Sequence, residues 1–265
     1  MKDNPVSFPQ FYLTAPQPCP YLPDRVEQKI FTPVNGQNAE AIHDVLSEGG
    51  FRRSHHILYR PHCAGCTACQ SIRVLADEFT PTRSQRRIMR MNEDLIVKER
   101  PAEATAEQFA LMAHYLDERH KHGGMDDMTA EDFRVMIDGS PIDTVLVEYR
   151  VPNHIPPANA DAATVSRPHD DKDRLIGVAL CDRMGTGWSM VYSFFDPDES
   201  KRSLGTFMIL DRIMNAQEHS KPHIYLGFYV EDCRKMAYKM KYQPAELWDG
   251  NDWVPCGDQA NDCND

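Results

Sequence analysis

Residues 175–217, LIGVALCDRMGTGWSMVYSFFDPDESKRSLGTFMILDRIMNAQ, contain the clearest succession of elements in the chain. Two mostly apolar segments, Leu175–Cys181 and Trp188–Phe195, have the length of buried strands, and the glycine-containing turn between them predicts that they pair antiparallel. A helix is expected from about Ser200 to Gln217, because large apolar residues recur there at helical spacing, at Leu204, Phe207, Leu210 and Met214.

Segments on both sides extend this succession. The expected elements are a helix opened by a capping box of Thr105 and Gln108, a helix capped by Thr129, strands over Ile142–Val151 and Ile224–Val230, and a short helix over Asp232–Lys239. The polar run Pro152–Asp173 is expected to be a flexible insertion, since it has few large apolar residues. The acidic residues after Trp248 are expected to form a tail.

This order resembles the N-acetyltransferase-like fold, in which a long helix follows two central antiparallel strands. In that fold the N-terminus of the helix receives the pyrophosphate of acyl-CoA, and small residues let the backbone approach the phosphates closely. The loop Arg202–Phe207 has the arginine and the glycine of that motif but ends on a bulky phenylalanine. The resemblance therefore implies the fold, whereas Phe207 argues against acyl-CoA as the donor.

The first hundred residues also mix helices and strands. The expected elements are a strand over Val26–Val34, a helix capped by Asn38 with Ile42, Val45 and Leu46 inward, strands over Phe51–Arg60 and Ser71–Phe79, a basic helix over Pro81–Asn92 and a short strand over Leu95–Lys98. We therefore predict an α+β protein. A smaller α/β N-terminal domain with a cysteine loop would occupy residues 1–100, an N-acetyltransferase-like C-terminal domain residues 101–250, and an acidic tail residues 251–265.

Three cysteines lie at two-residue intervals in GFRRSHHILYRPHCAGCTACQSIR, residues 50–73. The chain has eight cysteines in 265 residues, which is not the pattern of a disulfide scaffold. Cys63, Cys66 and Cys69 therefore indicate a metal ion, a cluster or a tight functional loop. The alternative is a loop of buried structural thiols, since cysteine packs well as a small apolar residue. His56 and His62 could substitute as ligands but fit surface positions better.

Charge is distributed unevenly along the chain. Residues 51–90 contain eight arginines and two acidic residues, a net charge of +6, whereas the rest carries −17, since the whole chain carries −11. A basic segment on an acidic protein steers a polyanion to one place, and the planar guanidinium suits phosphate and carboxylate. The alternative is a surface whose arginines are neutralised by salt bridges.

A second dense stretch, YLGFYVEDCRKMAYKMKY at 225–242, contains four tyrosines and three lysines. Tyr225, Gly227 and Tyr229 would share one face of a strand. Lys235 and Lys239 would share one face of a helix, with Tyr238 beside them. The alternative is a strand with aromatic packing and a helix whose lysines face water.

Four segments in this order resemble the aminoacyl-tRNA–protein transferases over roughly residues 8–250: PCPYLPDRVEQKIF at 18–31, GFRRSHHILYRPHC at 50–63, TRSQRR at 82–87 and YLGFYVEDCRKMAYKMKYQP at 225–244. The likeness is to the bacterial branch of the family. It implies transfer of leucine from leucyl-tRNA to the N-terminal α-amine of proteins that begin with aspartate or glutamate, which marks them for degradation through the N-degron pathway. Eukaryotic relatives transfer arginine instead.

The resemblance also bears on the cysteines. In eukaryotic relatives a CxxC near the N-terminus contributes to a metal or iron–sulfur site, whereas here only Cys19 of that pair is present. Cys19 with Cys63, Cys66 and Cys69 could supply four thiolates to zinc or to an iron–sulfur cluster. The transfer itself requires no cofactor.

The implied reaction is aminolysis of an activated ester, which needs a neutral amine, although an α-amine has a pKa of about 8. Positioning and oxyanion stabilisation could supply most of the rate. The candidate catalytic residues are Tyr225, Tyr229, Lys235, Tyr238 and Lys239, and the candidate substrate-binding residues are Arg52, Arg53, Ser54, Tyr59, Arg86 and Arg87. One arginine pair is expected to bind the acceptor carboxylate and the other the tRNA phosphates.

Three other functions are compatible with the residues. They are arginyl transfer in the same family, CoA-dependent N-acetylation, and a non-enzymatic cysteine-cluster module for nucleic-acid binding or redox sensing. The N-terminal MKDNPVSFPQ lacks the pattern of a signal peptide, and no apolar run approaches the ~18 residues that span a bilayer. A cytoplasmic protein without a membrane partner is therefore expected.

Overall fold

The computed structural model describes residues 9–119, 128–153, 173–231 and 233–257. Most of the expected insertion Pro152–Asp173 and the end of the expected acidic tail lie outside these residues. No helix among the described residues is both long enough and apolar enough to cross a membrane.

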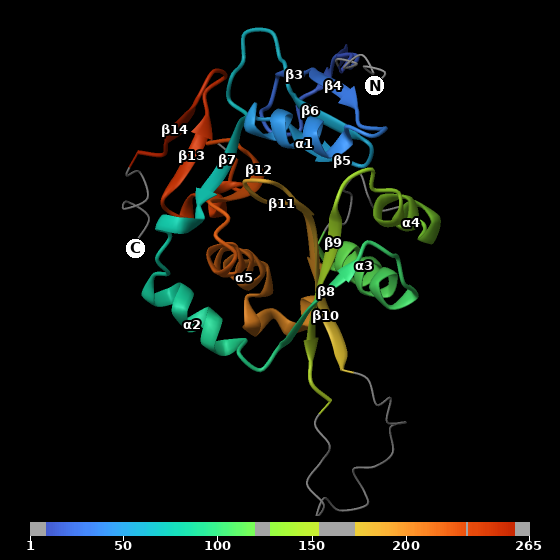
Figure 1. Ribbon diagram of the computed structural model, residues 1–265, viewed down its shortest axis with the longest axis vertical. Helices are drawn as coiled ribbons and strands as arrows, with labels where there is room; N and C mark the ends of the chain where they lie inside the picture. The colour runs from blue at the N-terminus through green and yellow to red at the C-terminus, as the bar shows by residue number, and fades with distance from the viewer. Residues whose placement is uncertain (1–8, 120–127, 154–172, 232, 258–265) are drawn as a thin grey trace, which may run out of the picture.

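An eight-stranded sheet forms the larger part of the molecule (Figure 1). Its strands, in spatial order, are β14 (Trp253–Pro255), β13 (Ala245–Trp248), β7 (Gln70–Leu75), β12 (His223–Tyr229), β11 (Gly187–Phe195), β10 (Arg174–Arg183), β9 (Thr144–Val151) and β8 (Ile96–Pro101). Neighbouring strands are antiparallel except β11 and β12, which are parallel. The predicted antiparallel pair of strands and the long helix after it are confirmed.

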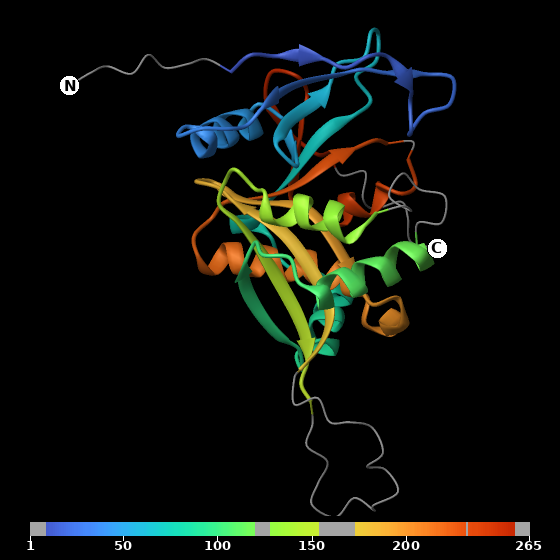
Figure 2. The ribbon, with the colours of Figure 1, turned by 90° about the vertical axis from the view of Figure 1, so that its right-hand side faces the viewer.

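Helices cover both faces of this sheet (Figures 1 and 2). Alternation along β9 explains why: Val147 and Tyr149 pack with α5 (Leu204–Glu218), whereas Leu146 packs with α3 (Ala106–Arg119) and α4 (Ala130–Asp138). The basic helix α2 (Arg83–Met91) lies beside α5 on the first face. The predicted capping box at Thr105 is present, and the predicted cap at Thr129 forms a capping box with Asp132.

A smaller sheet and helix α1 (Ala39–Glu48) sit against one end of the large sheet (Figure 2). The smaller sheet has the order β1 (Tyr12–Leu13), β4 (Lys29–Pro33), β6 (Ile57–Pro61) and β5 (Arg52–Ser54), and β2 (Gln17–Pro18) pairs separately with β3 (Val26–Glu27). The sheets divide between β6 and β7 rather than near residue 100. The reason is that β7, α2 and β8 all belong to the larger body.

Several expected elements differ in the structure. Phe51–Arg60 forms a hairpin rather than one strand, because the chain turns at His55 with φ of 50°. Val45 does not face inward but is 70% exposed, and the buried face of α1 consists of Ala39, His43 and Ser47. The residues after Trp248 are not only a tail, since they form β14.

The helix expected from about Ser200 is also interrupted. A 3-10 segment, η3 (Pro197–Arg202), precedes α5, and Ser203 between them has a left-handed backbone. The short helix expected over Asp232–Lys239 is instead the 3-10 turn η4 (Ala237–Lys241). Lys235 therefore lies outside this turn and shares no helix face with Lys239.

Candidate functional site

The parallel strands β11 and β12 pair over only part of their length. The paired positions are Gly187 with His223, Trp188 with Ile224 and Ser189 with Tyr225. Both strands continue beyond this point, to Phe195 and Tyr229. Their backbone groups beyond Ser189 and Tyr225 are therefore not paired with each other, which leaves a gap in the middle of the large sheet.

The guanidinium of Arg52 lies at this gap. Its Nη2 donates a hydrogen bond to the carbonyl of Val191 on β11 at 2.6 Å. On the β12 side a Cβ placed on Gly227 would lie 2.7 Å from the Nη1 of Arg52, and Gly227 has φ of +77°, which favours glycine. Strand β5 of the small sheet thus places the guanidinium of Arg52 between β11 and β12 of the large sheet.

Lys239 lies beside Arg52 and is only 5% exposed. Its Nζ donates a hydrogen bond to the carbonyl of Phe228 on β12. Burial, followed by the positive charge of Arg52, lowers the pKa of Lys239 to about 7. A substantial fraction of this amine is therefore neutral near pH 7, which is the form that accepts a proton.

Aromatic side chains surround the Arg52–Lys239 pair. The ring of Tyr59 meets Phe228 edge-on at 5.6 Å between centroids, and the 44%-exposed Tyr238 lies near Lys239. Burial raises the pKa of Tyr21 to about 12, with Arg52 acting in the opposite direction. The hydroxyl groups of these tyrosines offer hydrogen bonds to a ligand, and their rings offer flat apolar faces.

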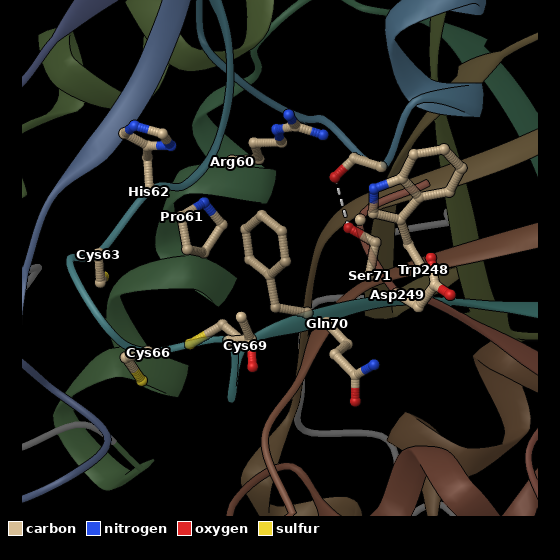
Figure 3. Close-up of a pocket in the computed structure, with 14 residues that line it drawn as sticks. Arg60, Pro61, His62, Cys63, Cys66, Cys69, Gln70, Ser71, Trp248 and Asp249 are labelled. Carbon is tan, nitrogen blue, oxygen red and sulfur yellow. Dashed lines mark hydrogen bonds between the residues drawn. The ribbon is translucent and has the colours of Figure 1, made fainter. Parts of the chain in front are cut away.

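The cysteine loop forms the wall of an adjacent cavity of about 210 Å³ (Figure 3). Its lining includes Cys69, Phe228 and Trp248, so it reaches from the loop to β12 and the β13–β14 turn. Burial, and then the neighbouring thiols of Cys19, Cys63 and Cys66, raise the pKa of Cys69 to about 12. All four candidate cysteines are thus brought into one neighbourhood.

These thiols do not form a closed set of metal ligands in this arrangement. Bonds of ~2.3 Å to tetrahedral zinc would place the sulfurs within about 4 Å of one another. Among the described residues, one group of three side chains has its ligating atoms within 4.8 Å of one another. It consists of His114, Asp196 and Asp198 and contains no cysteine. Cys63 instead exchanges hydrogen bonds with the backbone of Gln28 on the neighbouring segment. The metal prediction stays a prediction, and no step proposed below depends on it.

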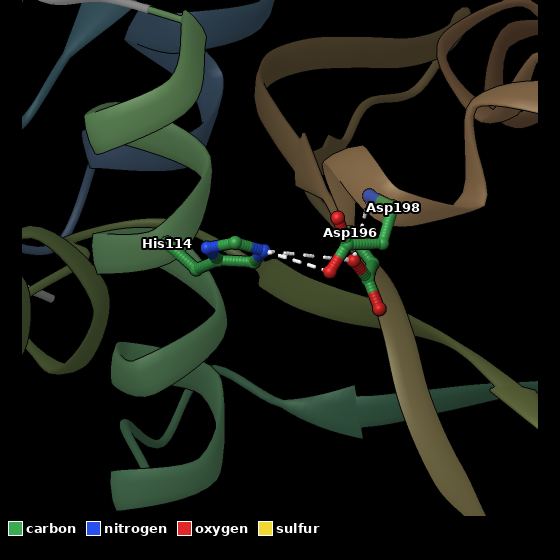
Figure 4. A group of neighbouring side chains, drawn as sticks. All are labelled: His114, Asp196 and Asp198. Carbon is green, nitrogen blue, oxygen red and sulfur yellow. Dashed lines mark hydrogen bonds and ion pairs between the residues drawn. The ribbon is translucent and has the colours of Figure 1, made fainter.

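The group of His114, Asp196 and Asp198 lies on the surface, between α3 and the start of η3 (Figure 4). The Nε2 of His114 is 3.3 Å from a carboxylate oxygen of Asp198 and 3.9 Å from one of Asp196. Asp196 also pairs with Arg174 at 2.8 Å. This group is a network of charges in which His114 and Asp198 are exposed and Asp196 is largely buried.

Arg53 does not join Arg52 at the gap. It is buried, and its Nε and Nη2 donate hydrogen bonds of 2.7 and 2.6 Å to the carboxylate of Asp182 on β10. Thr144 donates to the same carboxylate, and His43 lies 3.5 Å from it. This pair holds the small sheet against the large one. The hydroxyl of Ser54, at the end of β5, lies 3.2 Å from the Nδ1 of its neighbour His55.

Tyr225 and Tyr229 do not share a strand face as expected. A bulge at Gly227 shifts the register of β12 against β7, so that Phe228 follows Tyr225 on the side of the small sheet. Tyr229 packs against the main core. The Tyr225 hydroxyl bonds to Glu48, with Thr186 and Arg73 nearby, away from Arg52. The site therefore contains Arg52, Tyr59, Tyr238 and Lys239 from the predicted set.

Sequence reasoning missed several residues of the site. The pKa of Tyr115 and of Tyr192 is raised by burial, and Tyr115 also lies close enough to influence the pKa of Tyr238. Tyr21 stands in the first resembling segment and could have been found there. Tyr115 and Tyr192 carry no local signal, since they look like ordinary apolar positions of a helix and a strand.

Comparison with known proteins gives a consistent family. The model of the C terminus of arginine-tRNA-protein transferase matches residues 107–249, and that of its N terminus matches residues 17–87. A Bradyrhizobium sp. (strain BTAi1) protein named aspartate/glutamate leucyltransferase is 47% identical over 96% of this chain and 94% of its own length. One of the same name from Sinorhizobium medicae is 49% identical over 92% of this chain and 91% of its own length.

A solved structure is similar in fold. The crystal structure of FemX matches 83% of this chain and 69% of its own length with a TM-score of 0.51 at 11% identity. This likeness supports the predicted α+β fold.

Proposed function

The chain belongs to the arginine-tRNA-protein transferase family of aminoacyltransferases, and on this premise we propose that it transfers leucine from leucyl-tRNA to proteins that begin with aspartate or glutamate. The donor and the acceptor are proposed from the shared name of relatives at 47–49% identity over nearly the whole chain. The observation that carries the chemistry is the Arg52–Lys239 pair at the gap between β11 and β12.

Lys239 is the proposed proton acceptor. The acceptor protein brings an ammonium group, and its proton passes to the neutral Nζ of Lys239, which leaves a nucleophilic amine. The amine attacks the ester carbonyl of the leucyl group, a C–N bond forms, and the bond to the ribose oxygen breaks. The proton on Lys239 then passes to that ribose oxygen. The nitrogen of the new bond still carries one extra proton, which passes to the Nζ of Lys239, now neutral again, and from there to water, so the products are the amide, the ribose hydroxyl and one released proton.

Arg52 is the proposed reader of the acidic side chain. It is the cation of the Arg52–Arg53 pair that remains available, since Arg53 is occupied by Asp182. A carboxylate bound to its guanidinium would hold the acceptor's first residue beside Lys239, so that the adjacent α-amine points at the gap. The exposed ring of Tyr238 offers a stacking surface to the terminal adenine of the tRNA.

Acyl-CoA is a poor fit as the donor. Arg202, the arginine of the resembling phosphate loop, makes two hydrogen bonds of 2.8 Å to the carboxylate of Asp94 and one of 3.1 Å to Glu199. Phe207 is buried in the core. Pyrophosphate binding is disfavoured in two ways. Arg202 is already paired with two carboxylates, and the bulky Phe207 stands where the motif has a small residue.

The proposed function is tested by in-vitro transfer. Labelled leucine or arginine, each attached to its tRNA, is offered with peptides that begin with Asp, Glu or Lys. We expect leucine on the Asp and Glu peptides only. Arginine transfer would assign the chain to the other branch of the reaction, and labelling from acetyl-CoA in a parallel reaction would overturn the proposal.

Arg52→Gln should separate acceptor recognition from donor binding. Loss of a charge-assisted hydrogen bond of ~1.5–3 kcal/mol predicts a KM for an Asp-initiated peptide about 10- to 150-fold higher. The Kd for leucyl-tRNA should change less than about threefold. Steady-state kinetics and filter binding measure the two. Equal losses in both would contradict the assignment of Arg52 to the acceptor, and Arg134→Gln on the exposed face of α4 serves as the control.

A further inference from the structure

Helix α2 presents four arginines on one face. Arg83, Arg86, Arg87 and Arg90 have the spacing i, i+3, i+4 and i+7, which places them together on one side of a helix. All four are exposed, whereas Gln85 and Asn92 on the opposite side are buried. Thr82 and Gln85 form a capping box, so the start of the helix is well defined.

These four arginines lack the carboxylate partners that half of the described arginines have. Nine arginines elsewhere in the described chain form ion pairs with carboxylates, namely Arg53, Arg73, Arg100, Arg134, Arg150, Arg174, Arg183, Arg202 and Arg212. Within the described residues none of the four on α2 has such a partner, and the Nη1 of Arg86 donates a hydrogen bond to the carbonyl of Pro81. On a chain of net charge −11, an unneutralised cationic face requires an explanation other than stability.

Helix α2 also contacts the turn that carries part of the candidate site. The side chain of Gln85 donates a hydrogen bond of 2.9 Å to the carbonyl of Lys241, the last residue of η4. The same turn carries Tyr238 and Lys239. Lys235 and Lys241 are exposed next to it. Exposed cations therefore stand both on α2 and on the segment that carries Lys239.

We propose that the α2 arginines, with Lys235 and Lys241, bind the phosphate backbone of the acceptor arm of the donor tRNA. This inference rests on the proposed function and deepens it, because it assigns the surface that holds the RNA while its aminoacylated end enters the gap. It also separates two roles: Arg52 binds a carboxylate, and the α2 arginines, Arg86 and Arg87 among them, bind phosphates.

The spacing of the cations favours a polyanion over a single acidic group. Nine residues of helix extend about 13 Å, and side chains three or four positions apart have Cβ atoms about 5–6 Å apart. Four guanidinium groups in such a row match a run of phosphates, whereas one carboxylate would engage only one or two of them. Contacts to phosphates carry little sequence information, so selection of the leucine-carrying tRNA would take place elsewhere.

The test replaces all four arginines of α2 with glutamine. The control replaces Arg100, Arg134, Arg174 and Arg183 with glutamine, which changes the net charge by the same amount at ion-paired positions. The probe is deacylated tRNA for leucine, bound at several salt concentrations. The α2 variant should bind at least 50-fold more weakly near 100 mM salt, and its slope of log Kd against log salt should be flatter by about 3.

Transfer kinetics then distinguish the possible outcomes. We expect the α2 variant to show a raised KM for leucyl-tRNA with kcat nearly retained, because saturating tRNA still places its end in the gap. If wild type transfers leucine and the α2 variant keeps its tRNA affinity and salt slope, the surface proposal is wrong. If equal weakening appears in the control variant, net charge and not α2 is responsible, which also overturns it. Failure of the wild-type protein to transfer leucine instead overturns the proposed function.

Discussion

Replacing Lys239 with methionine is expected to lower kcat for leucyl transfer by about 10²-fold or more, the usual contribution of a positioned acid or base. The change removes the group that takes the proton from the acceptor amine and returns it to the ribose oxygen. It should not unfold the protein, because methionine fills a similar volume and the only hydrogen bond that the Lys239 side chain makes within the described residues is to the carbonyl of Phe228. Circular dichroism of the variant confirms folding.

The pH dependence gives an independent check. The pKa of Lys239 is lowered to about 7, and the reaction requires its neutral form, so wild-type activity should rise as pH increases through about 7. In the methionine variant only the amine of the acceptor titrates, with a pKa of about 8, so the residual rate should keep rising to that higher pH. Steady-state rates between about pH 5.5 and 9 measure both profiles.

Lys239→Arg distinguishes proton transfer from a purely electrostatic role. Arginine keeps the positive charge but does not give up its proton in proteins. We therefore expect it to be as inactive as methionine. An arginine variant with wild-type rate and pH profile would exclude Lys239 as the proton acceptor. Lys98→Met, at an exposed position on the edge strand β8, controls for the loss of a lysine.

The largest effect on stability is expected at Arg53. Arg53→Met should lower the free energy of unfolding by about 3–5 kcal/mol, because the carboxylate of Asp182 would remain buried without its cation. The protein should also lose much of its transfer activity, since this pair joins β5, which carries Arg52, to β10. Urea unfolding measures the loss of stability.

Two further variants test whether the loss of stability comes from the unpaired charge of Asp182. Arg53→Met combined with Asp182→Leu removes both charges and should recover most of the lost stability. Arg134→Met breaks the exposed pair with Glu131 and should cost less than about 1 kcal/mol. A double variant no more stable than the single one would show that Arg53 acts through packing rather than through its charge.

Local patterns predicted most individual elements correctly. The capping box at Thr105 and the cap at Thr129 are local features, because the atoms that interact are a few residues apart. Predictions went wrong where a single backbone conformation changed the pattern. The left-handed turn at His55 converted one strand into a hairpin, and the bulge at Gly227 moved Phe228 to the face expected for Tyr229.

The positions of the arginines in the basic segment, residues 51–90, could not be predicted from the sequence either. Its arginines were counted together, but the structure distributes them to a buried ion pair at Arg53, to the gap at Arg52 and to the exposed face of α2. The side chains of neighbouring residues in a strand point to opposite faces, so those of Arg52 and Arg53 necessarily lie on different sides of β5. Which of them would meet a buried carboxylate depended on a residue 129 positions away.

By itself, the sequence of this protein determined its family, its mixture of helices and strands and the residue types available for acyl transfer, because motifs and periodicities are properties of neighbouring residues. Only the tertiary structure decided that Arg52, Tyr59, Tyr238 and Lys239 form one site and that Tyr225, Arg53 and Lys235 lie outside it. The physical reason is that Lys239 becomes a weak base through burial and through the charge of Arg52. Both conditions arise only when distant segments pack together.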